Sequence, residues 1–83
     1  MSSDPKPRTP MEERLSGYWR ELLGVEVVKP GDHFFELGGN SMMATLLANR
    51  IEDELGIRPS MEVLFDTLER VATACEELVE ESG

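Results

Sequence analysis

Cysteine, basic residues and long apolar runs are all scarce in this 83-residue chain. With Cys75 as its one cysteine, the chain can form no intramolecular disulfide and no cysteine-based metal site, and a reducing, cytoplasmic location is expected. Eight Lys and Arg stand against 17 Asp and Glu, which argues against nucleic-acid binding because phosphate contacts need clustered basic residues. The longest nearly apolar run, Met42–Ala48, is far short of the roughly 20 residues of a membrane span. The start MSSDPKPRTP has no apolar stretch, so no signal peptide is expected there.

Strand alternation and internal repeats are also absent, and apolar residues recur instead at helical spacing. Residues 1–10 hold three of the five prolines and predict a disordered lead, followed by a single domain over residues 11–81. We expect helices over residues 11–23, 42–55, 61–65 and about 68–80. The expected fold is all-α, a small four-helix bundle of three longer helices and one short helix. A long loop joins the first two helices, and its Phe34, Phe35 and Leu37 are expected to enter the core.

The second expected helix carries more apolar residues than one buried face can hold. At about 100° per residue, its core stripe consists of Met43, Ala44, Leu47, Ala48, Ile51 and Leu55. Met42 and Leu46 fall on the opposite, polar side, directly after Ser41. Exposed apolar side chains of this kind indicate a docking surface for other proteins. The alternative is that the long loop or the short helix folds over them.

The run Gly38–Ser41 lies where the long loop enters this helix, and it is the strongest candidate site in the chain. Glycines permit unusual backbone angles, and a helix start offers free N–H groups to a phosphate near the Ser41 hydroxyl. The plainer alternative is that Ser41 is only an N-cap. A serine nucleophile would need a base and an oriented acid, and only His33 is available. Cys75 lies on an apolar helical stripe and is expected to be a core residue.

The stretch Asp32–Met42 closely resembles the D-x-F-F-x-L-G-G-[HDN]-S-[LM] core of peptidyl carrier proteins, also called thiolation domains. Trp19–Gly24 is similar to the first-helix W-x-x-L-L-G element of that family. Val63–Leu68 is similar to the family's segment before the last helix. The spacing of these elements agrees from about residue 11 to residue 80, which is nearly the whole expected domain.

The resemblance implies a non-catalytic carrier. A phosphopantetheinyl transferase, using coenzyme A and magnesium, would attach 4′-phosphopantetheine to Ser41, with Gly38, Gly39 and Asn40 around the attachment. The thiol of the arm would hold an aminoacyl or peptidyl group as a thioester, loaded by an adenylation enzyme and used by condensation or tailoring enzymes. Residues expected to dock those partners are Met42, Leu46, Phe34 and Met61. No metal site and no catalytic residue is expected, and the chain is expected to be a monomer.

Two features favour the peptidyl type over fatty-acyl or polyketide carriers, which stay the nearest alternative. Asn40 stands where fatty-acid carriers usually have Asp, and no acid follows Ser41 until Glu52. The change to Asn removes one carboxylate that could hold magnesium. A more distant alternative is an unmodified helical interaction module. A chain that begins with Met and ends soon after its last helix suits a free-standing carrier, and the alternative is a domain excised from a large synthetase.

Overall fold

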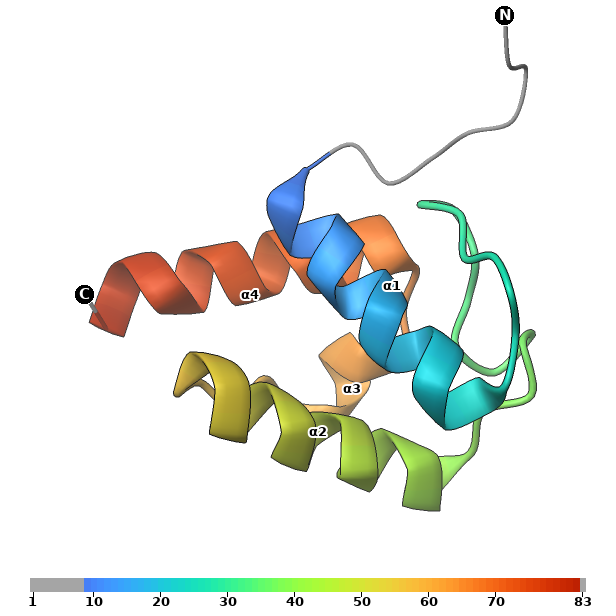
Figure 1. Cartoon of the computed structure of the whole chain (residues 1–83). Helices are drawn as coiled ribbons and strands as arrows, with labels where there is room; N and C mark the ends of the chain where they lie inside the picture. Colours follow the sequence, from blue (N-terminus) through green and yellow to red (C-terminus); the bar gives the residue numbers. More distant parts are fainter. Residues whose placement is uncertain (1–8, 83) are drawn as a thin grey trace, which may run out of the picture.

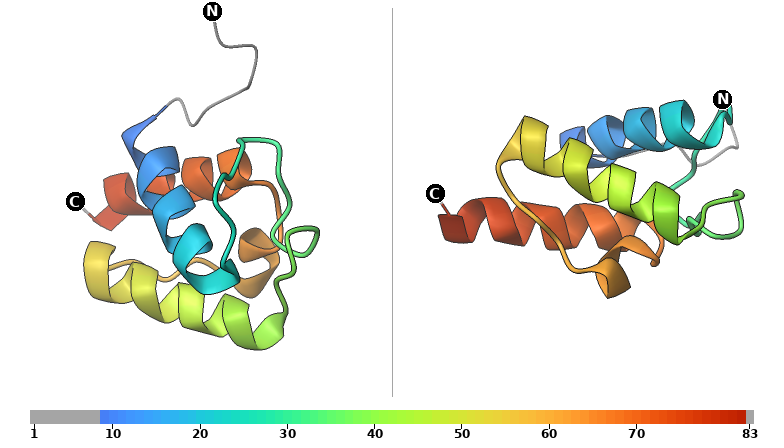
Figure 2. Two further views of the ribbon diagram at one scale, coloured as in Figure 1. Left: turned by 45° about the vertical axis from the view of Figure 1, so that its right-hand side comes forward. Right: turned by 90° about the horizontal axis from the view of Figure 1, so that it is seen from below.

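The computed structural model of the chain describes residues 9–82, within which there are four helices and no strand. In chain order the helices are α1 (Pro10–Leu23), α2 (Ser41–Leu55), α3 (Met61–Leu64) and α4 (Leu68–Ser82). Helix α1 packs against both α4 and α2, and the short α3 contacts α2 and α4 (Figure 1, Figure 2). The predicted all-α bundle of three long helices and one short helix is confirmed.

Helix α1 begins slightly earlier than the sequence predicted. The Thr9 hydroxyl is the N-cap and accepts a hydrogen bond from the Glu12 N–H at 3.1 Å. Pro10 occupies the first turn, where its missing N–H would have had no helical partner. Thr9 and Pro10 therefore belong to α1 and its cap, not to the predicted disordered lead of residues 1–10, and residues 1–8 lie outside the described part of the chain. Gly24 ends the helix in the left-handed conformation.

The ends of the other helices follow the local signals in the sequence. Helix α2 ends at Gly56, which has a φ of 71°, and Ser60 caps α3 with its side chain. Phe65, predicted as the last residue of α3, is its C-cap. At the start of α4, the Thr67 hydroxyl accepts a hydrogen bond from the Arg70 N–H at 3.4 Å. Helix α4 continues to Ser82, two residues past the predicted end.

The loop between α1 and α2 is tied to the start of α4 by its own backbone. The Leu68 N–H donates to the Asp32 carbonyl at 3.0 Å, and the Glu69 N–H donates to the Pro30 carbonyl at 2.9 Å. These two N–H groups belong to the first turn of α4, which has no helical acceptors of its own. The loop therefore supplies acceptors that α4 needs, and α4 in turn fixes the position of the loop.

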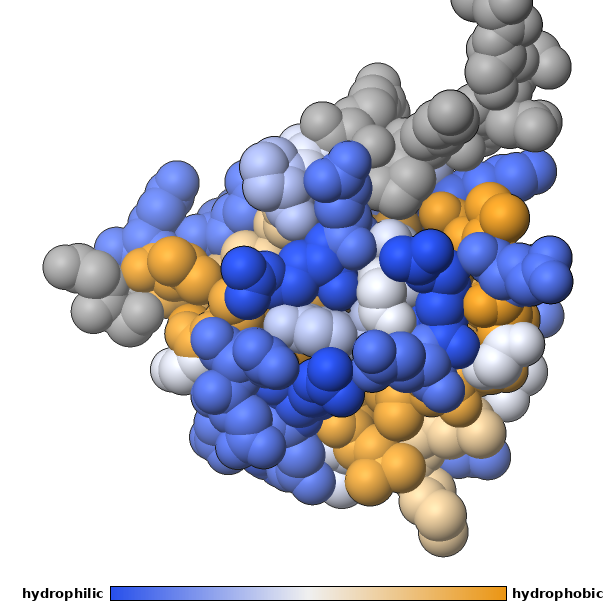
Figure 3. All heavy atoms as spheres, in the orientation of Figure 1, coloured by the Kyte–Doolittle hydropathy of each residue, from blue (hydrophilic) through white to orange (hydrophobic). Residues whose placement is uncertain are grey.

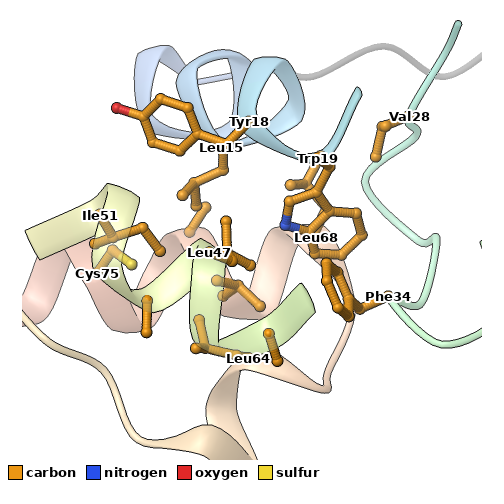
Figure 4. Packing of buried hydrophobic residues seen from close by; sticks show 14 of the residues in the cluster. Leu15, Tyr18, Trp19, Val28, Phe34, Leu47, Ile51, Leu64, Leu68 and Cys75 are labelled. Carbon is orange, nitrogen blue, oxygen red and sulfur yellow. The ribbon is translucent and has the colours of Figure 1, made fainter. Parts of the chain in front are cut away.

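One hydrophobic core joins all four helices and the loop (Figure 4). Each helix contributes apolar side chains to it, because burial of these side chains is the main stabilising term available to a domain without disulfides. Val79 of α4 stays exposed, near the end of the helix that projects beyond α1 in Figure 1. The buried apolar residues are Leu15, Tyr18, Trp19, Val28, Phe34, Ala44, Leu47, Ala48, Ile51, Ile57, Leu64, Leu68, Val71, Ala72 and Cys75.

Candidate functional site

A single aromatic side chain anchors the loop that leads to the site. Phe34 is fully buried, and its ring meets the Trp19 ring edge-on with centroids 5.2 Å apart and planes at 75° (Figure 4). The sequence predicted Phe34 both as a core residue and as a docking residue. The first prediction is confirmed, and the second is wrong because a side chain with no exposed surface cannot contact a partner.

After Phe34 the chain turns tightly back toward α2. The Gly38 N–H donates to the Phe35 carbonyl at 3.1 Å, and the Gly39 N–H donates to the Phe34 carbonyl at 3.0 Å. Gly38 has a φ of 101°, a backbone angle that residues other than glycine rarely adopt. The space where a Gly38 Cβ would lie is open, so this position needs glycine for its backbone angle and not for lack of room.

The cap of α2 is Asn40, not Ser41. Asn40 has extended backbone angles, and its Oδ1 accepts from the Met43 N–H at 2.9 Å. Its carbonyl accepts from the Ala44 N–H, also at 2.9 Å. Ser41 is the first residue of α2 and is exposed. The interpretation of Ser41 as a plain N-cap is therefore wrong, and its hydroxyl is available for another purpose.

The start of α2 suits a phosphate ester on the Ser41 hydroxyl. Among the described residues, no acceptor is bonded to the N–H of Ser41 or Met42, and the first turn of α2 has no acidic side chain. The positive end of the helix dipole therefore faces this position without a carboxylate to oppose a phosphate. A Cβ added at Gly38 would meet nothing within 4 Å, so the loop is open to solvent at this point beside Ser41. On these observations the residues fit a phosphopantetheine arm.

Several large apolar side chains are exposed near α2 and α3. Met42 is 75% exposed and Leu46 is 48% exposed, as their helical phase predicted, and Met61 at the start of α3 is also exposed. Figure 3 shows apolar atoms gathered at the surface over α2. Phe35 belongs with them, although the sequence analysis placed it in the core. Its ring is half exposed and lies against the Phe65 ring, with centroids 4.4 Å apart.

The other two candidate nucleophilic or basic groups have structural roles. Cys75 is buried in the core as predicted, and burial together with the nearby Glu76 carboxylate raises the pKa of its thiol to about 11. His33 pairs its backbone with Thr67 in an isolated bridge. Within residues 9–82, no group of three His, Cys, Asp or Glu side chains is placed to hold a metal ion. In the same range, no helix combines the length and apolar character needed to cross a membrane.

Comparison with known proteins agrees with this geometry. The family model described as "Phosphopantetheine attachment site" matches residues 13–78. Tyrocidine synthase 3 of Brevibacillus parabrevis is 41% identical over 68 residues, which is 80% of this chain and 1% of that protein. The dimodular nonribosomal peptide synthase of Bacillus subtilis is 45% identical over 64 residues, which is 77% of this chain and 3% of that protein. The chain thus spans only a small part of the length of the curated relatives it matches.

Solved structures give the same result at the level of the fold. An active-site mutant of a peptidyl carrier protein superposes with a TM-score of 0.86 at 25% identity, covering 94% of this chain and 89% of the other. The peptidyl carrier protein complex with the phosphopantetheine transferase Sfp and coenzyme A gives a TM-score of 0.84 at 25% identity, covering 88% and 97% of the two chains. The chain therefore belongs to the phosphopantetheine attachment site family, and its fold is similar to that of peptidyl carrier proteins.

Proposed function

We propose that Ser41 is the attachment residue and that 4′-phosphopantetheine is transferred to it from coenzyme A. The Ser41 oxygen forms a bond to the β-phosphorus of coenzyme A, and the bond from that phosphorus to the adenosine bisphosphate leaving group breaks. The Ser41 proton passes to a base of the transferase, because no basic side chain within residues 9–82 is hydrogen-bonded to the Ser41 hydroxyl. Once attached, the arm supplies a thiol that can hold an acyl group as a thioester.

The observation that carries this proposal is that Asn40, and not Ser41, is the N-cap of α2. Asn40 caps α2 with both its side chain and its carbonyl. Ser41 is left exposed at the first position of the helix, inside the segment that the family model matches. The cap also fixes the backbone where α2 begins, which limits the positions from which the Ser41 hydroxyl can meet a transferase.

The proposed cargo is an aminoacyl or peptidyl group. The relatives with peptidyl carrier structures support this assignment, and so does the lack of any acidic side chain in the first turn of α2. Tethering such a group on a flexible arm raises its effective concentration at each partner's active site. The expected partners are a phosphopantetheinyl transferase, an adenylation enzyme, and condensation or tailoring enzymes. A cytoplasmic location is part of the proposal, because loading requires coenzyme A and an adenylating enzyme.

We also propose where those partners dock. Met42, Leu46 and Met61 expose apolar surface on the two helices beside Ser41, and Phe35 takes the place in this set that the sequence had given to Phe34. Apolar side chains that stay exposed in a small domain are typical of protein contacts. Methionine adapts well to partners of different shapes, since its side chain is unbranched and flexible.

Two incubations test the attachment and the cargo separately. First, the chain is treated with coenzyme A, magnesium and a promiscuous phosphopantetheinyl transferase, and its intact mass is measured. One arm per chain is expected for the wild type and none for Ser41→Ala. An equal mass gain in the variant, or no gain in the wild type, contradicts the attachment. The modified chain is then offered to an amino-acid-activating enzyme and to a malonyl-loading enzyme, and loading only by the second favours a polyketide or fatty-acyl carrier.

A further inference from the structure

Gly39 lies in direct contact with the most deeply anchored side chain of the loop. A Cβ built on Gly39 would fall 2.4 Å from Cδ2 and 2.5 Å from Cε2 of the Phe34 ring, and 2.7 Å from the Phe34 carbonyl oxygen. All three separations are well inside van der Waals contact. The backbone at residue 39 therefore rests on the ring of Phe34 in the space that any side chain would occupy.

Neither of these neighbours can move aside easily. The Phe34 ring is fully buried and packs edge-on against Trp19 of α1, which is fully buried as well. The Phe34 carbonyl oxygen already accepts the Gly39 N–H at 3.0 Å, so the two backbones are held together. An added methyl group would have to displace the chain at residue 39, because close-packed interiors give little room for the ring to yield.

The two glycines of the motif are therefore needed for different reasons. Gly38 has a positive φ and open space around it, whereas Gly39 has no left-handed backbone angle and no space. The residue after Gly39 is the N-cap of α2, bonded to the helix through its Oδ1 and its carbonyl. Ser41 follows immediately. A displacement at residue 39 is thus transmitted over two peptide units to the Ser41 hydroxyl.

We propose that Gly39 is a positioning residue for the attachment reaction, and that the stack Trp19–Phe34–Gly39 fixes where Ser41 is presented to the transferase. This inference deepens the proposed function and rests on it. The reaction needs the Ser41 oxygen in line with a phosphorus held by another protein, and a misplacement of about 1 Å can cost on the order of 100-fold in rate. Gly39 contributes by allowing the chain to lie against a buried ring that cannot shift.

Kinetics of transfer test this with a matched glycine control. Gly39→Ala is expected to stay folded and to lose about tenfold or more in kcat/KM for phosphopantetheine transfer. Gly31→Ala is the control, since Gly31 lies in the same loop, has no positive φ and has nothing within 4 Å of its added Cβ. Its kcat/KM should stay within about twofold of the wild type. A folded Gly39→Ala chain that is modified at the wild-type rate overturns the proposal.

A second pair of variants decides the case in which Gly39→Ala fails to fold. Phe34→Leu removes part of the surface on which Gly39 rests, and Leu15→Ala is a core substitution in α1. The two are compared at temperatures where each is equally far below its own Tm. A larger loss of kcat/KM in Phe34→Leu supports the proposal, and an equal loss in both overturns it.

A readout without transferase separates this proposal from the attachment itself. Amide chemical shifts and hydrogen exchange are measured for residues 40–43 in the unmodified wild type and in Gly39→Ala or, if that variant does not fold, in Phe34→Leu. Shift changes and faster exchange concentrated at the Met43 N–H, which bonds to Asn40 Oδ1, support the positioning role even if no arm is attached to the wild type. Unchanged shifts at these residues overturn it.

Discussion

The assignment of capping to Asn40 and attachment to Ser41 can be tested by exchanging each residue for alanine. Asn40→Ala removes the Oδ1 that accepts from the Met43 N–H at 2.9 Å. Loss of an N-cap costs roughly 0.5–2 kcal/mol, typically about 1 kcal/mol. In a domain of 60–100 residues, about 1 kcal/mol corresponds to a fall in Tm of roughly 4–8 °C.

Ser41→Ala removes a hydroxyl that makes no capping bond in this structure. Alanine is also a better helix former than serine by up to about 0.5 kcal/mol, so the expected change in stability is close to zero or slightly favourable. Asn40→Ala should therefore have a lower Tm than the wild type and retain the attachment residue. Ser41→Ala should have a Tm close to that of the wild type and accept no phosphopantetheine.

Thermal unfolding followed by circular dichroism gives the stability, and intact mass after transferase treatment gives the attachment. Asn40→Asp is the control for the cap, because aspartate caps helices about as well as asparagine. The contrary result is a fall in Tm of roughly 4–8 °C for Ser41→Ala together with an unchanged Tm for Asn40→Ala. That result would show that Ser41 is the cap and that the reasoning about the site is wrong.

Further predictions concern the phase of α2 and the buried thiol. Leu47→Ala should lower the free energy of unfolding by about 2–5 kcal/mol, because it leaves a cavity in the core. Met42→Glu should change it by less than about 0.5 kcal/mol and weaken partner docking. The reverse ranking in denaturant titrations would show that the helical phase is wrong. The raised pKa of Cys75, about 11 against 9.0, means that the folded state holds its proton more tightly. The contribution of the protonated Cys75 thiol to the free energy of unfolding is therefore fully present below pH 9.0, and it is lost as the pH rises toward about 11. Thiol reagents at neutral pH should label Cys75 only after unfolding, and rapid labelling of the folded chain would contradict its burial.

Most of the helical architecture could be predicted because its signals are local and periodic. The apolar stripe of α2 repeats at helical spacing, so the sequence alone separated the buried Leu47 from the exposed Met42. Glycines after the last apolar residues of α1 and α2 marked the ends of both helices. The same reasoning placed Cys75 in the core.

The details of the loop could not be predicted in this way. Phe34 and Phe35 are adjacent aromatic residues in a segment without periodicity, and no pattern indicates which of them enters the core. Likewise, Asn40 and Ser41 are both good N-caps, so their order along the chain left the choice open. The steric need for glycine at residue 39 depends on the buried ring of Phe34 and is visible only in three dimensions.

Peptide mapping of the transferase-treated chain tests the central claim most directly. The chain has six serines, and the tryptic peptide 21–50 contains Ser41 as its single serine, since the Lys29–Pro30 bond resists trypsin. Fragmentation of that peptide by tandem mass spectrometry should place one phosphopantetheine on Ser41, with the other five serines unmodified. An arm on any other residue, or an unmodified Ser41 after treatment with an active transferase, would contradict the account.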